Sequence, residues 1–181
     1  MNGNAADWQR QPGQGRYARP ERERRFLVQG DPPAGISSRH IEDRYIEGTR
    51  LRLRRVSDGT NDVYKLTQKI RVSEGDPADV RITNAYLSRG EYELLTCLPA
   101  ATISKSRTAH RVGSRDLAVD LFKHRLDGLR LAELEVASLD EPVELPAWVG
   151  REVTHDDRYS GGSLAFASDE DVRLLLDRSL H

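Results

Sequence analysis

The chain has 181 residues, of which 31% are charged and 37% hydrophobic, and its 28 Lys and Arg residues nearly balance its 29 Asp and Glu residues. This length suits one domain with a substantial core or a closed barrel. The net charge of −1 argues against a general nucleic-acid-binding protein, which needs a basic field. The single cysteine, Cys97, excludes an intrachain disulfide framework and a zinc site built from several thiolates.

Residues 1–19 contain Gly, Asn, Gln, Pro and Arg with few apolar side chains, which predicts a flexible N-terminal tail. Residues 20–181 are predicted to form a single domain that ends in a helix. The sequence contains no run of about 18 apolar residues and no apolar segment near its start, so we expect neither a transmembrane helix nor a signal peptide. With a lone cysteine, these features predict a cytoplasmic protein without a membrane partner.

The elements predicted after the tail are mostly strands, because apolar and polar residues alternate with a period of two. We predict strands over residues 21–29, 39–47, 51–56, 63–71, 80–87, 103–107, 115–124 and 129–137. Helical signals are fewer: a short turn near 33–37, a helix over 88–98 that begins with a Ser88–Glu91 capping box, a segment over 163–166, and a last helix capped by Ser168. Eight strands joined mostly by short turns favour an α+β fold, an eight-stranded closed antiparallel β-barrel or tunnel with a few peripheral helices.

One face of most of these strands is charged. Glu21, Glu23 and Arg25 share a face of the first strand, and Glu133 and Glu135 share a face of the last. The strands between them present long basic residues and one carboxylate, namely Arg50, Arg52, Arg54, Lys65, Lys69, Lys105, Arg107 and Asp120. For one strand alone, and for the first stretch in particular, the ordinary explanation is a solvated face. An ordinary solvent face mixes charges of both signs with Ser, Thr, Asn and Gln, so this segregation favours a polar cavity.

Such a cavity has a definite chemistry. Arg and Lys side chains that point into one space bind several phosphate groups, and Arg adds bidentate contacts. Two Glu-x-Glu pairs on facing strands can hold Mg²⁺ or Mn²⁺ through oxygen ligands. A metal beside a basic clamp is the usual arrangement for phosphoryl transfer, so the sequence points to a small, highly charged anion such as a triphosphate.

Taken in order, these motifs resemble those of the CYTH domains, the triphosphate tunnel metalloenzymes. Glu21-x-Glu23-x-Arg25 resembles the ExExK signature of that family. Later segments resemble its Arg-rich, LTxK, KxR, VDxF and AExE strands, namely Arg52-x-Arg54, Leu66–Lys69, Ile103–Arg107, Val119–Phe122 and Leu131–Val136. The stretch from Trp148 to Ala165 resembles the end of the short bacterial members, which look most like inorganic triphosphatases. Each motif alone is weak, but together they span about residues 20–166 in the family's order.

The resemblance implies metal-dependent hydrolysis of inorganic triphosphate, or of a related triphosphate compound. We expect a monomer or homodimer, and the near-neutral charge predicts that it binds no nucleic acid. The resemblance also implies catalytic roles for Glu23, Glu135 and Lys69. It implies that the phosphates are bound by Arg25, Arg52, Arg54, Lys65, Lys69, Lys105, Arg107 and Arg81. It also implies that Mg²⁺ or Mn²⁺ is held by Glu21, Glu23, Glu133, Glu135 and Asp120.

One departure from the family pattern bears on activity. The fifth strand of the family usually reads R-x-E-x-E, whereas this chain reads Arg81-Ile82-Thr83-Asn84-Ala85. We therefore expect Thr83 and Ala85 to stand where the family carries carboxylates, which removes one acidic patch from the tunnel. Two alternatives to a triphosphatase stay open at this point: a class IV-type adenylate cyclase, and a polyphosphate- or nucleotide-binding module without turnover.

Overall fold

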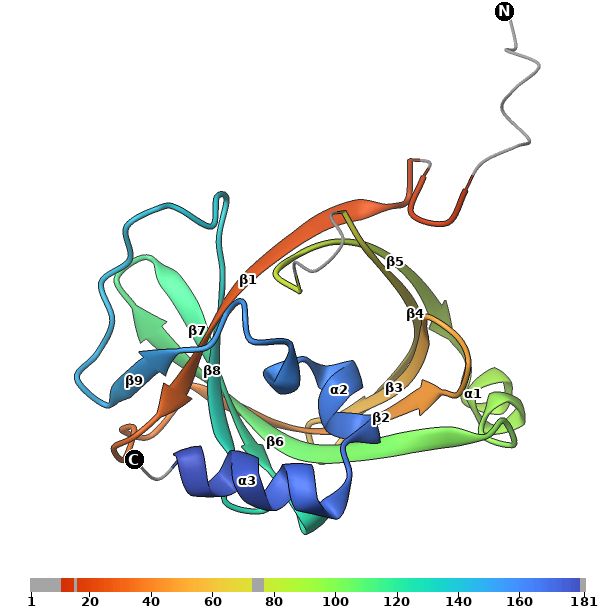
Figure 1. Ribbon diagram of the computed structural model, residues 1–181. Helices are drawn as coiled ribbons and strands as arrows, with labels where there is room; N and C mark the ends of the chain where they lie inside the picture. The colour runs from red at the N-terminus through yellow and green to blue at the C-terminus, as the bar shows by residue number, and fades with distance from the viewer. Residues whose placement is uncertain (1–10, 15, 73–76, 180–181) are drawn as a thin grey trace, which may run out of the picture.

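The computed structural model describes residues 11–14, 16–72 and 77–179, and its fold is a barrel of antiparallel strands with a few short helices around it (Figure 1). Residues 1–10 and 15 of the predicted tail lie outside the described residues, and the first strand begins at Arg19. In the described part of the chain, no helix is long and apolar enough to cross a membrane.

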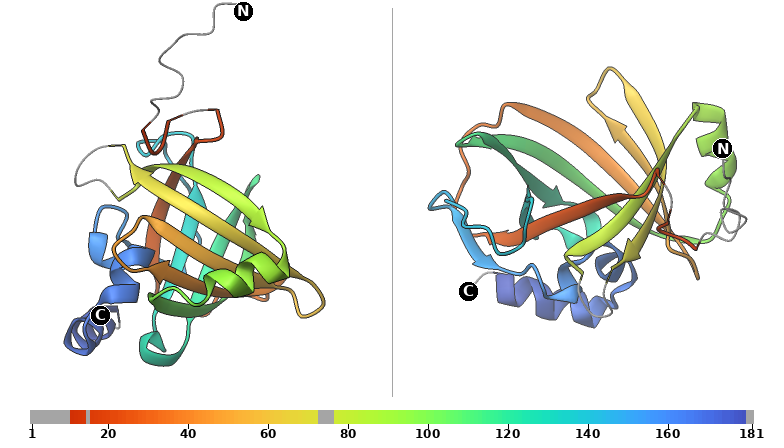
Figure 2. Two further views of the ribbon diagram at one scale, coloured as in Figure 1. Left: turned by 90° about the vertical axis from the view of Figure 1, so that its right-hand side faces the viewer. Right: turned by 90° about the horizontal axis from the view of Figure 1, so that it is seen from above.

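Eight strands form the barrel, in agreement with the prediction. They are β1 (Arg19–Val28), β2 (Ser37–Ile46), β3 (Leu51–Ser57), β4 (Asp62–Arg71), β5 (Asp79–Leu87), β6 (Ala100–Val112), β7 (Arg115–Phe122) and β8 (Arg130–Glu135). Their order is β5-β4-β3-β2-β6-β7-β8-β1, and a further pairing of β1 with β5 closes the sheet on itself (Figure 2). A ninth strand that was not predicted, β9 (Val149–Glu152), pairs with the end of β1.

The helices agree with the sequence except at one point. Helix α1 (Arg89–Leu95) begins with the predicted Ser88–Glu91 capping box, and α2 (Gly161–Phe166) and α3 (Asp169–Ser179) follow β9. Single 3-10 turns, η1 (His124–Leu126) and η2 (Asp157–Tyr159), lie in the loops. The helical turn expected near residues 33–37 is absent: residues 31–35 have no regular secondary structure, and β2 begins at Ser37.

Two apolar clusters decide which part of the barrel stays polar. One packs the end of the barrel nearest α2 and α3, where Leu131 and Phe122 meet Leu164 and Val172. The other covers the outside of β1, β7 and β8, where Phe26 and its neighbours are sheltered by the segment that leads into β9. The apolar side chains of these strands pack on the outside of the barrel and at one of its ends. The rest of the inner face therefore carries the charged residues.

Candidate functional site

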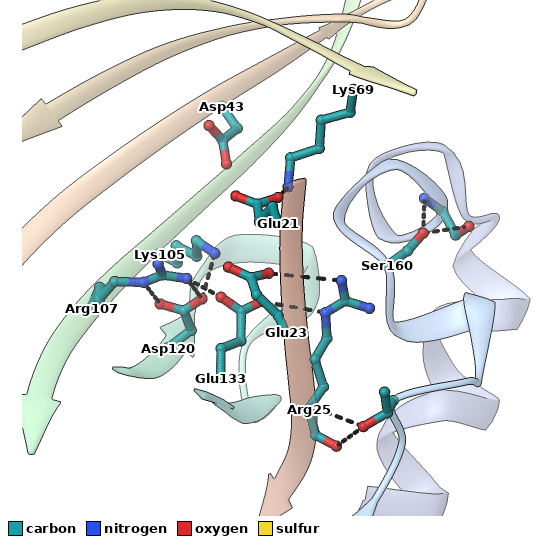
Figure 3. A network of polar contacts seen from close by, with 12 residues as sticks. Glu21, Glu23, Arg25, Asp43, Lys69, Lys105, Arg107, Asp120, Glu133 and Ser160 are labelled. Carbon is teal, nitrogen blue, oxygen red and sulfur yellow. Dashed lines mark hydrogen bonds and ion pairs between the residues drawn. The ribbon is translucent and has the colours of Figure 1, made fainter. Parts of the chain in front are cut away.

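The charged faces of the first and last strands lie side by side on the inside of the barrel. In the β1–β8 pair, Glu23 is opposite Glu135, and Arg25 is opposite Glu133. Residues directly opposite each other in an antiparallel pair point to the same side of the sheet. The two Glu-x-Glu motifs, which are more than a hundred residues apart in the sequence, therefore face the same space, as Figure 3 shows for Glu23 and Glu133.

A buried carboxylate organises two of the predicted phosphate-binding residues. Asp120 has no exposed surface, and both of its oxygens are occupied. The Nε and Nη2 atoms of Arg107 donate to Oδ1 and Oδ2 at 2.6 Å each, and Lys105 Nζ donates to Oδ2 (Figure 3). Arg107 also donates to Glu133. This geometry favours a positioning role for Asp120 over the metal-ligand role that the sequence suggested.

A second buried carboxylate, which sequence analysis did not single out, does the same on the neighbouring strands. Asp43 of β2 is 2% exposed, and it accepts from Arg54 Nε at 2.6 Å and from Arg54 Nη2 at 2.7 Å. Arg52 Nε lies 3.6 Å from Asp43 Oδ1. The sequence pattern that could have identified Asp43 is the alternation along β2, in which Ile41, Asp43 and Tyr45 share the face that points into the barrel. Arg54 and Arg107 are thus held in the same way, each by its Nε and Nη2 atoms, so the Nη1 group of each makes no hydrogen bond to that aspartate.

The charges of this network shift one another's pKa values. Burial alone raises the pKa of Asp43, but Arg54 and Arg52 outweigh it and hold that pKa well below its ordinary value. Burial likewise raises the pKa of Glu133, and the cations Arg107 and Lys105 reverse the shift. Both carboxylates are therefore ionised at neutral pH.

Glu23 behaves in the opposite way. Burial raises its pKa, and the neighbouring charge of Glu133 raises it further. Arg25 lies between the two carboxylates, with Nη2 at 3.9 Å from Glu23 and Nε at 3.6 Å from Glu133, and it does not cancel the shift at Glu23. Two neighbouring carboxyl groups with pKa values pushed in opposite directions are typical of sites in which one accepts a proton and the other stays charged.

A cavity of about 370 Å³ lies against this network. Its lining includes Glu21, Glu23, Arg25, Arg50, Arg52, Lys69 and the start of α2. Lys69 Nζ donates to Glu21 Oε2 at 2.5 Å, which links β4 to β1 across this wall. Arg25 and Arg52 are each more than nine-tenths buried, and among the described residues Arg25 Nη1 and Arg52 Nε have no hydrogen-bond partner. Buried donors of this kind cost about 1–3 kcal/mol each until an acceptor meets them, so they favour an anionic ligand in the cavity.

The fifth strand differs from the expectation. In the β4–β5 pair, Asn84 is opposite the inward residue Thr67, and Tyr86 is opposite Lys65. Arg81 and Thr83 are opposite Ile70 and Gln68 and lie on the outer face of the barrel, as does Ala85. The prediction that Arg81 binds phosphate is therefore wrong, and the positions that count are Val80, Ile82, Asn84 and Tyr86. None of these four carries a carboxylate. The inner face of β5 therefore lacks acidic residues, as expected, but the residues at that face are not Thr83 and Ala85.

The remaining carboxylates offer oxygen ligands to a divalent metal, but they do not form a dense cluster. Among the described residues, no three His, Cys, Asp or Glu side chains converge on one point. Glu21 and Glu23 line the cavity, and Glu135 is opposite Glu23. Mg²⁺ is commonly bound by one or two carboxylates together with the phosphates of a substrate, and these hard oxygen donors fit that kind of site.

The comparisons with known proteins agree with this fold. No protein-family model matches the chain, and no curated protein matches it. Two solved structures of the protein NE1496 are similar to this chain. One, described as an inorganic triphosphatase, is 25% identical with a TM-score of 0.57 over 82% of this chain and 95% of that chain. The other, described as a hypothetical protein, is 27% identical with a TM-score of 0.57 over 81% and 98% of the two chains.

More distant structures share the fold alone. A conserved hypothetical protein from Pyrococcus furiosus is 17% identical, with a TM-score of 0.50 over 88% of this chain and 90% of that chain. The likeness to NE1496 extends over nearly all of that protein. In its fold, its ordered motifs and its likeness to NE1496, the chain resembles the CYTH family of tunnel proteins.

Proposed function

We propose that this protein binds a triphosphate inside the tunnel and hydrolyses it with Mg²⁺ or Mn²⁺, and that inorganic triphosphate is the first substrate to test. The observation that carries the proposal is a pair of buried donor atoms, Arg25 Nη1 and Arg52 Nε, which make no hydrogen bond to the described residues and belong to side chains that line the same cavity as Lys69. The likeness to NE1496, which is described as an inorganic triphosphatase, supports this choice of substrate.

The basic residues bind and orient the phosphate chain. Arg54 and Arg107 are each held on one edge by a buried aspartate, so their planar groups keep a fixed direction when the ligand arrives. Lys105 and Lys69 add ammonium groups to the same inner face. Charges fixed in this way stabilise the charge that develops on a phosphoryl group without reorganising, which is the largest contribution that such sites make to catalysis.

The carboxylates of β1 and β8 serve the attacking water. Glu23, with its raised pKa, accepts the proton of the water as the water oxygen bonds to phosphorus and the P–O–P bond breaks. Glu135, opposite Glu23, is placed to orient that water, and Lys69 stabilises the departing phosphate oxygen. A divalent ion held by one or two of the carboxylates Glu21, Glu23 and Glu135, together with phosphate oxygens of the substrate, would neutralise part of the phosphate charge.

The test is release of orthophosphate from tripolyphosphate by the purified protein with Mg²⁺ or Mn²⁺. We expect Glu23→Gln to lower turnover by about a hundredfold or more, which is the usual contribution of a general base. The matched control is Glu93→Gln on the exposed helix α1, which should leave turnover unchanged. Absence of release from the wild-type protein under all conditions would contradict hydrolysis.

A second candidate is a binding protein without turnover. It is favoured by the inner face of β5, which carries no carboxylate, and by the ion pair that occupies Glu133. In that case tripolyphosphate would bind, as measured by calorimetry, and no product would form. The two candidates share the same clamp and differ only in whether Glu23 and Glu135 activate water.

A further inference from the structure

The strand that carries Arg25 has a gap along one of its edges. On that edge β1 pairs with β5 as far as Arg22, opposite Asp79, and with β9 only from Phe26, opposite Glu152. In the described part of the chain, no strand pairs on this edge with the three residues in between. An N–H and a C=O that point out of a strand at such a gap need other partners, because buried main-chain groups are nearly always hydrogen-bonded.

The residues just after β9 supply the partners of Arg25. Thr154 Oγ1 accepts from the N–H of Arg25 at 3.0 Å, and the N–H of Val153 donates to the carbonyl oxygen of Arg25 at 2.8 Å. Val153 and Thr154 are both buried, and Val153 packs into the apolar cluster near α2 and α3. A loop that leads to the C-terminal helices therefore takes the place of a strand at Arg25.

The hydroxyl of Thr154 is oriented by an ion pair on the outer face of the barrel. It donates its proton to Glu152 Oε1 at 2.5 Å, whereas its other acceptor, the carbonyl oxygen of Arg25, is 3.5 Å away. A lone pair of Oγ1 is thus left for the N–H of Arg25. Glu152 in turn accepts from Arg24 Nε at 2.8 Å and from Arg24 Nη2 at 2.5 Å, a bidentate pair that fixes the carboxylate.

The guanidinium of Arg25 depends on this support more than those of Arg54 and Arg107, which buried aspartates hold directly. Its nearest carboxylate oxygens belong to Glu23 and Glu133, at 3.9 Å and 3.6 Å (Figure 3). These distances are longer than hydrogen bonds, and Nη1 makes no hydrogen bond to the described residues. The position of this donor in the cavity is therefore set by where the main chain of Arg25 is held.

We propose that Thr154 is a positioning residue for triphosphate binding, whose hydroxyl holds the main chain of Arg25 so that Nη1 meets a phosphate oxygen. The Arg24–Glu152 pair supports this role from the outer face by orienting the hydroxyl. Thr154 does not line the central cavity, so its effect on the ligand passes through Arg25. The inference rests on the proposed function, because the cavity must first bind a triphosphate.

The experiment measures tripolyphosphate binding with Mg²⁺ by calorimetry, in a parent protein that carries Glu23→Gln so that the ligand stays intact. Thr154→Val removes the hydroxyl and keeps the branched shape, and it should weaken binding about fivefold or more because a charge-assisted hydrogen bond is misplaced. Thr154→Ser, which keeps the hydroxyl, should bind within about twofold of the parent. The matched control is Thr102→Val at an exposed position of β6, which has the same limit.

A double-mutant cycle with Arg25→Gln separates positioning from a general loss of structure. Arg25→Gln alone should weaken binding about tenfold or more. Adding Thr154→Val should then weaken it by no more than about a further twofold, because the two residues act through one contact. Glu152→Gln leaves the Thr154 hydroxyl in place and removes only its charged acceptor. It should show the same dependence on Arg25, and it replaces Thr154→Val in the cycle if that variant does not fold.

The outcomes separate the positioning role from the function on which it rests. If the parent binds tripolyphosphate, the role is refuted by equal weakening with and without Arg25, or by no weakening in the parent, and the proposed function stands. If the parent binds no tripolyphosphate, the proposed function fails and the positioning role fails with it. A loss of affinity that requires Arg25 and that Thr154→Ser does not share supports the inference.

Discussion

Replacing Asp120 by asparagine tests whether this residue positions the clamp or binds a metal. The substitution keeps the shape of the side chain and one acceptor oxygen, but it removes the charge that three buried donor groups of Arg107 and Lys105 now share. Hydrogen bonds to charged groups contribute about 1.5–3 kcal/mol each, so losing two of the three predicts a loss of about 3–6 kcal/mol. Breaking buried ion pairs by removal of one partner typically costs about 3–5 kcal/mol, in the same range.

Urea unfolding at pH 7, followed by far-UV circular dichroism, measures this loss. With a slope of about 2 kcal/mol per molar urea, the midpoint of Asp120→Asn should fall by about 1.5–3 M. The matched control is Asp116→Asn on the same strand, because Asp116 is exposed and its pair with Arg111, at 3.1 Å, is a surface pair. We expect that control to change stability by about 1 kcal/mol or less.

The opposite pattern would refute the positioning role. A loss of stability below about 1 kcal/mol for Asp120→Asn, together with a large loss of Mn²⁺ affinity, would show that the carboxylate serves a metal. Unchanged Mn²⁺ affinity with the expected fall in stability would support the arrangement in which Asp120 belongs to the arginine and lysine.

Further predictions follow from the same network. Arg54 lowers the folded-state pKa of Asp43 despite burial. The ionised Asp43 carboxylate therefore stabilises the protein above its unfolded pKa of about 3.9, and this stabilisation is lost as the pH falls through the folded value. The difference in stability between wild type and Asp43→Asn should shrink below about pH 4, and a difference independent of pH would contradict this. Burial and Glu133 raise the pKa of Glu23, so its ionised form destabilises the protein once the pH rises above the unfolded value; Glu23→Gln should raise the melting temperature at pH 7, by about 2–4 °C for each kcal/mol gained, and a lower melting temperature would refute the shift. Arg54→Lys loses the planar fork that contacts Asp43 and that, in the proposed function, also binds phosphate, so it should weaken tripolyphosphate binding about tenfold by calorimetry, whereas Arg55→Lys on the outer face should have no effect.

The strands whose alternation is strong were predicted from the sequence with the correct inward face. In β3 and β4 the basic residues alternate with leucine and isoleucine, so the phase of Arg52 and Lys69 follows from local pattern alone. The β5 segment has no such contrast around Thr83, Asn84 and Ala85, and its phase was taken from the family motif. The pairing of Thr67 with Asn84, a contact between strands, sets the actual phase and cannot be seen in the segment itself.

The ion-pair partners of the charged residues also could not be predicted from the sequence. The sequence showed that acids and bases share the inner face, but not which of them neutralise each other. Asp120 pairs with Arg107, 13 residues away in sequence, and Glu21 pairs with Lys69, 48 residues away. The first pairing depends on the register of the β6–β7 hairpin, and the second arises only when the barrel closes. Because neither is visible in the sequence, the expected metal ligands included a carboxylate that the fold uses to hold the clamp.

The ion pairs also bear on stability. Arg54–Asp43 and Arg107–Asp120 remove charged groups from water, and their contribution depends on the full set of hydrogen bonds rather than on the charges alone. The two pairs lie on the strand pairs β2–β3 and β6–β7, and β2 is itself paired with β6. The clamp is thus built into the most continuous part of the barrel, which is where a fixed geometry is easiest to maintain.

The most direct test of the account is calorimetric titration of the wild-type protein with tripolyphosphate and, separately, with orthophosphate, in the presence of Mg²⁺. If the cations of several strands contact one ligand, each additional phosphate adds at least one charge-assisted hydrogen bond, worth about a factor of ten. Tripolyphosphate should then bind with one molecule per chain and about a hundredfold or more tighter than orthophosphate. Equal affinity for the two anions, or no saturable binding of tripolyphosphate, would contradict a triphosphate-binding tunnel.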